Sequence, residues 1–255
     1  MKPIIKNHSF QKRIIFYTLV TRFDEYSEMV ESAKKAGFDR DDIDFFYFDN
    51  KNSNDFDGYS GINHAIKFSK AEYIVFCHQD ILFNYDGYEQ LIRCIDELDN
   101  IDSKWVIAGN AGKTQDGKPI RKISDPHGIN QTFGPFPSKV ISVDENFILI
   151  NNKYNLACTY QLNGFHLYGI DLCTNAINLG LKCYVIDFHL YHKSAGNIDR
   201  SFYESREKFI KVQYERLKRK FFSTTCTSFY VTNNIILNFI LNSKIINSLL
   251  RRFIK

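Results

Sequence analysis

Strand-like and helix-like segments alternate through the first third of the chain, and this alternation limits the possible folds more than any other feature. Residues 13–20 (RIIFYTLV), 44–49 (DFFYFD) and 73–77 (YIVFC) are short apolar runs typical of buried strands. Residues 24–36 and 59–69 lie between them and have the polarity and end signals of helices. Alternation of this kind predicts an α/β fold with a mostly parallel central sheet flanked by helices.

The composition is that of an ordinary globular protein. The 255 residues are 44% hydrophobic and include only 13 Gly and 5 Pro, which excludes collagen-like and disordered classes. The six cysteines have no CxxC spacing, which favours reduced core thiols over a disulfide framework or a zinc site. Residues 1–12 lack the apolar core of a signal peptide, so we expect a cytoplasmic protein.

Polar side chains directly follow two of the predicted strands. Asp49 ends the second and Asn50 follows it, and His78, Gln79 and Asp80 follow the third. In an open parallel sheet, ligands bind beyond the carboxyl ends of the strands. We therefore expect a ligand site here.

The rest of the chain continues with strand and helix patterns around one long excursion. The Gly-, Pro- and Lys-containing segment 109–139 has at most short strands, and a segment of this length is usually functional or mobile. The other expected elements are strands at 105–108, 142–150 and 183–186 and helices at 88–98 and 165–179.

At this point the ordered motifs resemble a known family. The strand ending in Asp49-Asn50, the helix containing Gly61-Ile62-Asn63, the strand that leads to Asp80, and the segment 165–173 (FHLYGIDLC) occur in the order of the GT-A glycosyltransferases, specifically the family 2-like enzymes. The resemblance covers about residues 12–215, and within it residues 201–211 (SFYESREKFIK) look like the helix that closes the domain in bacterial members. It implies a GT-A domain over 1–200, with a nucleotide-sugar half at 12–108 and an acceptor half at 109–200.

The resemblance implies a divalent metal, Mn²⁺ or Mg²⁺, held by Asp80 and His192. The family writes the first motif as Asp-x-Asp, but this chain has His78-Gln79-Asp80. His78 is therefore expected to contact the nucleotide, with metal binding as an alternative. Asp80 could instead cap a turn, and His192 could be a structural histidine for which His189 competes.

The resemblance also implies a general base, and Asp171 is the expected residue. One carboxylate must take the acceptor proton in a single inverting displacement. Gly169 and Ile170 stand where the family commonly has a second acidic residue, so Asp171 could instead be a helix cap. Asp144 and Glu145 form the alternative pair.

Further contacts to substrate follow from the same resemblance. The acceptor is expected to meet three residues, Asp144, Glu145 and His166. The nucleotide sugar is expected to meet seven, Thr18, Arg22, Asp49, Asn63, His78, Gln79 and Asp80. Segment 109–139, which carries four basic residues between 113 and 122, could close over a diphosphate as a mobile lid or remain a solvated loop.

The basic surplus of the chain lies in its last 55 residues. Residues 201–255 hold 11 basic and 3 acidic side chains, whereas residues 1–200 hold 22 basic and 26 acidic, so nucleic acid is not expected as a partner. Apolar residues recur at helical spacing over 235–254. This predicts a basic, amphipathic, helical C-terminal extension that lies on an anionic membrane, associates with a second copy, or packs on its own domain.

Together these features predict a metal-dependent, inverting glycosyltransferase. It would move a sugar from a nucleoside-diphosphate sugar to a glycan or lipid-linked acceptor, as in lipopolysaccharide or capsule assembly, at the inner face of the cytoplasmic membrane. Two alternatives remain open: a non-catalytic nucleotide-sugar-binding relative, which the incomplete Asp-x-Asp motif permits, and a nucleotidyltransferase. The latter is disfavoured because residues 17–24 (YTLVTRFD) contain no Gly-rich loop.

Overall fold

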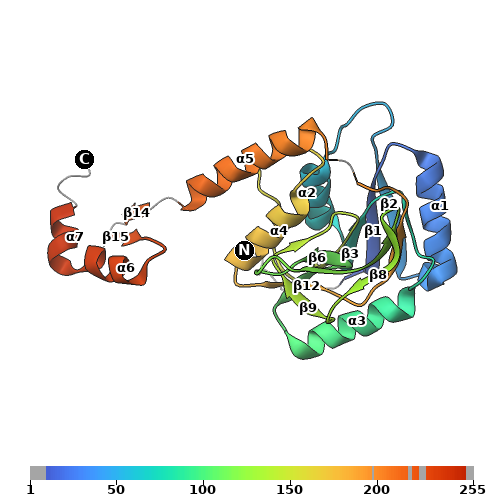
Figure 1. Ribbon diagram of the computed structural model, residues 1–255, viewed down its shortest axis with the longest axis horizontal. Coiled ribbons are helices and arrows are strands. Elements are labelled where there is room, and N and C mark those ends of the chain that lie inside the picture. Colours follow the sequence, from blue (N-terminus) through green and yellow to red (C-terminus); the bar gives the residue numbers. More distant parts are fainter. Residues whose placement is uncertain (1–9, 197, 218–219, 224–227, 251–255) are drawn as a thin grey trace, which may run out of the picture. The chain divides into compact units, whose positions relative to one another are not determined.

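The chain forms two compact units, which divide between Ser205 and Arg206. The computed structural model describes residues 10–196, 198–217, 220–223 and 228–250 (Figure 1). The sequence pattern placed the division between residues 200 and 201. Helix α5 (Arg200–Leu217) crosses the boundary.

Most elements belong to the first unit. Its helices are α1 (Phe23–Ala33), which continues as one π-helical turn (Lys34–Phe38), α2 (Gly58–Phe68), α3 (Tyr88–Ile101) and α4 (Tyr168–Asn178). Its strands are β1 (Lys12–Val20), β2 (Ile43–Asp49), β3 (Ala71–Cys77), β4 (Ile81–Leu82), β5 (Trp105–Gly109), β6 (Ala111–Lys113), β7 (Pro119–Asp125), β8 (Gly128–Phe133), β9 (Ser138–Val140), β10 (Ser142–Val143), β11 (Phe147–Asn151), β12 (Lys182–Val185) and β13 (Leu190–His192).

The central sheet has seven strands within the described residues, in the order β2-β1-β3-β11-β5-β12-β9. Strands β2, β1, β3, β5 and β12 run in one direction, whereas β11 and β9 run in the other. The predicted α/β class with a mostly parallel central sheet is confirmed. The antiparallel strand β11 lies between β3 and β5, and it brings the residues that precede it to the carboxyl end of β3.

Helices cover both faces of this sheet (Figure 1). The main core joins one face of β1 and β3, through Phe16 and Val75, to the apolar sides of α1 and α3, through Met29 and Leu91. Helices α2 and α4 lie on the opposite face, where the Cβ of any residue replacing Gly58 would overlap the ring of Tyr168. Burial of apolar side chains on both faces explains why these strands are nearly continuous hydrophobic runs.

The long excursion is more regular than the sequence pattern indicated. Residues 111–133 form β6, β7 and β8, which belong to a second sheet with the order β10-β6-β7-β13-β4 and with β8 beside β7. Strand β7 alone has seven residues. These strands are short and polar, without a clean alternation, so they gave little signal in the sequence. Strand β7 also pairs with β13, which is distant in sequence. The lid function of this segment stays a prediction.

Two predicted elements differ from the structure near the site. The single strand expected over 142–150 is two strands in different sheets, β10 and β11, interrupted by Asp144, Glu145 and Asn146. The helix expected from residue 165 begins at Tyr168, after Leu167 in a left-handed conformation (φ 68°). Both differences give the acceptor-side residues loop positions instead of positions in regular elements.

The second unit is partly β-structure, which the prediction of a helical extension missed. It contains the antiparallel hairpin of β14 (Lys220–Ser223) and β15 (Ser228–Val231), followed by α6 (Ile235–Asn242) and α7 (Lys244–Leu250). The helical prediction over 235–254 is correct for the described part, as two short helices, and its last four residues lie outside that part. Among the described residues, none of the helices combines the length and apolarity needed to cross a bilayer.

Candidate functional site

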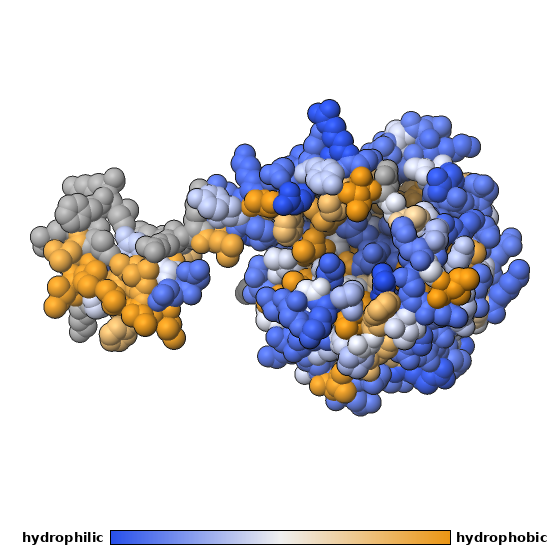
Figure 2. Space-filling model, in the orientation of Figure 1, coloured by the Kyte–Doolittle hydropathy of each residue, from blue (hydrophilic) through white to orange (hydrophobic). Residues whose placement is uncertain are grey.

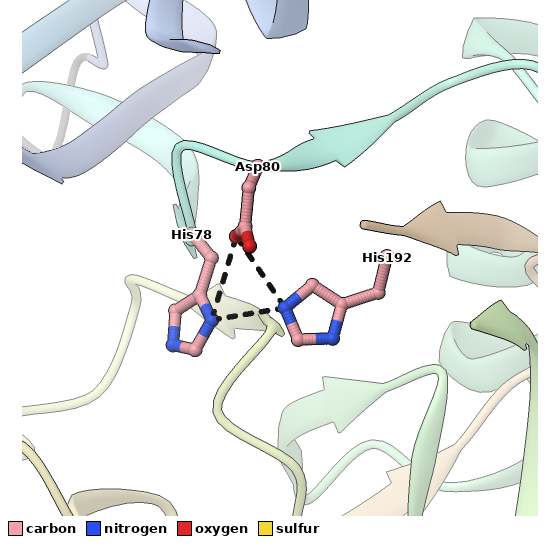
Figure 3. Close-up of side chains that lie close together, drawn as sticks. All are labelled: His78, Asp80 and His192. Atoms are coloured by element: carbon pink, nitrogen blue, oxygen red, sulfur yellow. Dashed lines mark hydrogen bonds and ion pairs between the residues drawn. The ribbon is translucent and has the colours of Figure 1, made fainter. Parts of the chain in front are cut away.

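Three side chains that could bind a metal meet beyond the carboxyl end of β3. His78 and Asp80 belong to the turn between β3 and β4, and His192 ends β13. The two-residue strand β4 pairs with β13, which sets His192 opposite Ile81 and therefore beside Asp80. Figure 3 shows the two imidazole rings and the carboxylate pointing toward one another. The pairing of β4 with β13 thus unites residues that are far apart in sequence.

The donor atoms of the three side chains lie within 4.8 Å of one another. Asp80 Oδ1 is 3.4 Å from His192 Nε2 and 4.0 Å from His78 Nδ1, and the two ring nitrogens are 3.4 Å apart. The side chains of Asp80 and His192 are about nine-tenths buried, whereas that of His78 is 39% exposed. The cluster is therefore reached from solvent past His78.

The electrostatics of the cluster favour an ionised carboxylate. Burial opposes ionisation of Asp80, but hydrogen bonding and attraction from His192, with a smaller contribution from His78, hold the pKa of the carboxyl well below its usual range. Burial and the neighbouring His192 lower the pKa of His78, which favours the neutral ring. For His192, the effect of burial is outweighed by Asp80, and its pKa is raised. A carboxylate and a neutral imidazole are the forms that bind metal, so a cation here would have to displace the proton that Asp80 stabilises on His192.

Tyr168 fixes the orientation of His78. Its hydroxyl donates to the backbone carbonyl of Glu145 at 3.3 Å and lies 3.2 Å from His78 Nε2. With its proton donated to Glu145, the hydroxyl oxygen can accept from His78 Nε2–H, and in that tautomer the Nδ1 lone pair would face the cluster. Partners that fix the tautomer in this way are usual around metal-binding histidines. No motif in the sequence indicated this role for Tyr168.

The donor set suits a divalent transition metal. Two imidazole nitrogens and one carboxylate oxygen suit Mn²⁺ better than Mg²⁺, because Mg²⁺ typically has a shell of oxygen ligands only. Asp80 and His192 were predicted as metal ligands, and His78 chiefly as a nucleotide contact. The structure brings all three together, so the alternative role of His78 as a ligand fits the geometry better.

The interruption between β10 and β11 places Glu145 at the first turn of α4. Gly169 N–H donates to Glu145 Oε1 at 3.1 Å, and a Cβ at Gly169 would lie 2.6 Å from Val143 O and 3.2 Å from Glu145 Cγ. Val143 and Glu145 therefore occupy the space that a side chain at 169 would need. Its carboxyl is partly buried, and this burial, together with the nearby charge of Asp144, outweighs the backbone donors and raises its pKa to about 8.

The neighbours of Glu145 connect this turn to the metal-binding cluster. Asp144 is exposed and accepts from Asn146 N–H, and the carbonyl of Asn146 accepts from His78 N–H at 3.0 Å. The buried side-chain oxygen Oδ1 of Asn146 has no hydrogen-bond partner within the described part of the chain. Such an oxygen is available to a water or ligand.

Asp171 is enclosed in the interior, contrary to what a general base requires. Its side chain is fully buried, and its two oxygens accept from Thr159 N–H at 2.6 Å and from Thr159 Oγ1–H at 2.7 Å. A base must reach the proton that it removes. The geometry therefore argues against the predicted catalytic role and favours a role in fastening the loop before α4. The sequence placed Asp171 correctly on the helix, but the sequence gives no information on the direction of the side chain.

Two of the predicted nucleotide contacts have their side chains engaged elsewhere. Thr18 is fully buried against Cys77, with 3.5 Å between Oγ1 and Sγ. Asn63 uses its amide group to hold both backbone groups of Cys158. Both side chains are thus engaged within the fold, which argues against the predicted contacts with the nucleotide.

The remaining predicted nucleotide residues do lie around the ends of β1, β2 and β3. Arg22 and Asp49 are exposed, with Arg22 paired to Glu25 at 2.5 Å. Gln79 Oε1 accepts from the backbone N–H groups of Thr21 and Arg22 at 2.9 and 3.0 Å. Gln79 therefore fastens the loop after β1 to the loop that carries the metal-binding cluster.

Two other histidines with predicted roles, His189 and His166, lie outside the metal-binding cluster. His189 stacks on Tyr85 and lies 2.9 Å from Ser124 Oγ, away from Asp80, so its competing role as a ligand is not supported. His166, a predicted acceptor contact, is half-buried beside Ser201 Oγ at 3.0 Å. Its acceptor role stays a prediction.

Comparison with solved structures defines the class of fold. The chain resembles GalNAc-T7, determined with UDP, GalNAc and Mn²⁺, at a TM-score of 0.53 and 7% identity over 80% of this chain and 48% of that one. It also resembles S. aureus TarS in complex with UDP-GlcNAc, at a TM-score of 0.50 and 13% identity over 79% of this chain and 66% of that one. These neighbours are glycosyltransferases, and the chain has a GT-A-like fold. It spans about half of the GalNAc-T7 chain.

Comparison with curated sequences gives the family. The chain is 34% identical over 207 residues to a protein of *Fuscovulum blasticum* described as "ATP synthase subunits region ORF 6". The match covers 78% of this chain and 82% of that protein, and the chain belongs to the same family. No protein-family profile matches the sequence.

Proposed function

We propose that this protein is a metal-dependent glycosyltransferase that uses a nucleoside-diphosphate sugar. The observation that carries the proposal is the cluster of His78, Asp80 and His192 beyond the carboxyl end of β3 in a GT-A-like fold. One fold can support many reactions, so the function has to be inferred from the residues of the site. Here one buried carboxylate and two imidazoles converge at the edge where an α/β sheet binds its ligand.

The three side chains would hold Mn²⁺, or Mg²⁺ with lower preference. A divalent cation supplies positive charge to a diphosphate as it leaves. The protein's own contribution is to keep Asp80 ionised, to present His78 Nδ1 through the Tyr168 hydrogen bond, and to hold His192 through β13. Gln79 holds the adjacent backbone, on which we propose that Arg22 and Asp49 contact the nucleotide.

We propose Glu145 as the general base in place of Asp171. The Glu145 backbone is joined to the cluster through Tyr168, its carboxyl is partly accessible, and its raised pKa makes it a stronger base than an ordinary glutamate. In an inverting displacement, Glu145 would accept the proton of the acceptor hydroxyl as that oxygen attacks the anomeric carbon and the nucleoside diphosphate leaves. Asp144 and His166 would bind other groups of the acceptor.

The finer parts of the proposal concern substrate and place. UDP-sugars are the first donors to test, because the two structural neighbours were determined with UDP or UDP-GlcNAc. We propose a family 2-like enzyme that is cytoplasmic and acts at the inner face of the cytoplasmic membrane. Its acceptor would be a glycan or lipid-linked glycan of lipopolysaccharide or capsule assembly.

Donor binding and transfer can be tested on the intact chain. Thermal shift with UDP-, GDP-, dTDP- and CMP-sugars, each with and without Mn²⁺, should show stabilisation by one nucleotide class that depends on the metal. Product analysis with the binding donor then separates transfer from binding alone. Metal-dependent binding without transfer to any glycan or lipid-linked acceptor, and without donor hydrolysis, would favour the non-catalytic alternative.

Asp80→Asn tests the metal site itself. We expect at least a hundredfold loss of Mn²⁺ affinity, measured by electron paramagnetic resonance of the free ion, and a matching loss of turnover, since the substitution removes the one strong anionic ligand. Asp116→Asn changes an exposed carboxylate in the turn after β6 and serves as the control. Equal Mn²⁺ affinity in the two variants would refute the site.

A further inference from the structure

In the second unit, apolar side chains of α6 and α7 are exposed, whereas polar side chains of α6 form hydrogen bonds within the unit. On α6, Ile235, Ile236 and Phe239 are 84%, 68% and 81% exposed, and on α7 Ile245 is 77% exposed. Figure 2 shows the surface over α6 and α7 as predominantly hydrophobic. Soluble proteins rarely leave contiguous apolar surface of this kind without a partner.

The polar face of α6 is already used within the unit. Asn238 accepts from Thr232 N–H at 2.7 Å and donates to its carbonyl at 3.0 Å. Asn242 makes the same pair of bonds to Tyr230, both at 2.8 Å. Residues 238 and 242 are one helical turn apart, so this face of α6 is fastened along the β15 side of the hairpin. The contacts hold the helix with its apolar side chains turned away from the hairpin.

The charge pattern of the sequence identifies the partner. Residues 221–243 contain no charged side chain, and basic residues flank them on both sides. Residues 206–255 together hold 11 basic and 2 acidic side chains, a formal charge of +9. Two copies of this unit would repel each other, whereas an anionic surface would attract it. Basic residues beside an uncharged apolar segment are typical of proteins that lie in a membrane interface.

We infer that the unit formed by residues 206–255 binds the surface of an anionic lipid bilayer, with the apolar side chains of α6 and α7 entering the boundary between headgroups and acyl chains. The flanking basic residues contact the acidic headgroups. The hydrogen bonds of Asn238 and Asn242 keep polar groups paired inside the unit, so that none of these four bonds has to break on insertion. This docking does not depend on the proposed transferase activity.

The test is vesicle flotation of the full chain. Vesicles of phosphatidylcholine with phosphatidylglycerol should bind on the order of tenfold more protein than vesicles of phosphatidylcholine alone, and added salt should weaken the binding. The double variant Ile236→Ser, Phe239→Ser should lose on the order of tenfold or more of this binding. The control Ile129→Ser, Phe133→Ser changes exposed apolar residues of β8 in the first unit and should bind as the wild type does.

A second readout reports insertion directly. The only tryptophan, Trp105, is fully buried in the first unit, so Phe239→Trp adds a probe whose fluorescence is distinguishable from a constant background. We expect a blue shift with the anionic vesicles and none with phosphatidylcholine. Absence of the shift, or equal flotation of the two double variants, would overturn the proposal. So would a wild-type dimer in solution that Phe239→Ser converts to a monomer.

Discussion

Glu145 and Asp171 both lie against the first turn of α4, and they differ in almost everything else. Asp171 belongs to the helix itself, is fully buried and gives both oxygens to Thr159. Glu145 comes from the loop between β10 and β11, remains partly accessible, and takes the place that Gly169 leaves free. The hydroxyl of Tyr168 contacts both the backbone carbonyl of Glu145 and Nε2 of His78, and so connects Glu145 to the metal-binding cluster.

The role of a carboxylate in this site therefore follows from its hydrogen-bond partners and its burial, and not from its position in a motif. A carboxylate saturated by backbone and hydroxyl donors stabilises a loop. One whose burial and acidic neighbour outweigh its backbone donors gains basicity, which is useful in proton transfer. Substitution of Glu145 should therefore lower the rate without loss of stability, whereas substitution of Asp171 should lower the stability with little change in rate.

The largest effect is expected from Glu145→Gln. Removal of the base should lower kcat by a factor on the order of 10²–10⁴, with Mn²⁺ affinity nearly unchanged. The glutamine keeps the volume and avoids the cost of burying a charge, so its thermal midpoint should not fall. Steady-state kinetics and Mn²⁺ titration measure the two quantities. Asp144→Asn is the matched control, and a kcat loss of equal size there would move the base assignment to Asp144.

The pH dependence of the rate should report the same group. A base with a pKa of about 8 is mostly protonated at neutral pH, so kcat/KM should rise about tenfold per pH unit below that value and level off above it. Asp144, Tyr168, Tyr59 and Cys158 surround the carboxyl. Asp144 raises the pKa, so Asp144→Asn should shift the midpoint to lower pH. An unshifted midpoint would mean that another group controls the profile.

A smaller effect on rate, but a clear one on stability, is expected from Asp171→Asn. The asparagine cannot accept from both donors of Thr159 with equal strength, so we expect a loss of about 1–3 kcal/mol in the free energy of unfolding. Denaturant titration measures this loss. Turnover per folded molecule should stay within a few-fold of the wild type. A kcat loss as large as that of Glu145→Gln, without destabilisation, would restore Asp171 as the base.

Much of the fold could be predicted from sequence because its first half is locally regular. The apolar runs of β1, β2 and β3 and the helices between them agree with the predicted ranges to within a few residues, since burial on both faces leaves a strong pattern. The strands of the second sheet were missed or merged. These strands are short and half-exposed, so their periodicity is weak, and β13 pairs with β4 and β7, which are distant from it in sequence.

The candidate site was predictable only in part. Residues that directly follow strands, such as Asp80, could be expected at the ligand edge from topology alone. Side-chain direction could not, and this is why Thr18, Asn63 and Asp171 proved to be engaged elsewhere. The place of Glu145 follows from a chain interruption and a glycine on another element, a pairing that a single sequence does not reveal.

The hydrogen bonds of Gln79 have a thermodynamic consequence. One side-chain oxygen holds two amides of the loop after β1, while the neighbouring residues, His78 and Asp80, line the cation site. Gln79 therefore joins the two loops, and whatever orders one restricts the other. Cation and nucleotide should consequently bind with positive heterotropic cooperativity, each raising the affinity for the other by the same factor. In Gln79→Ala that reciprocal factor should fall toward one.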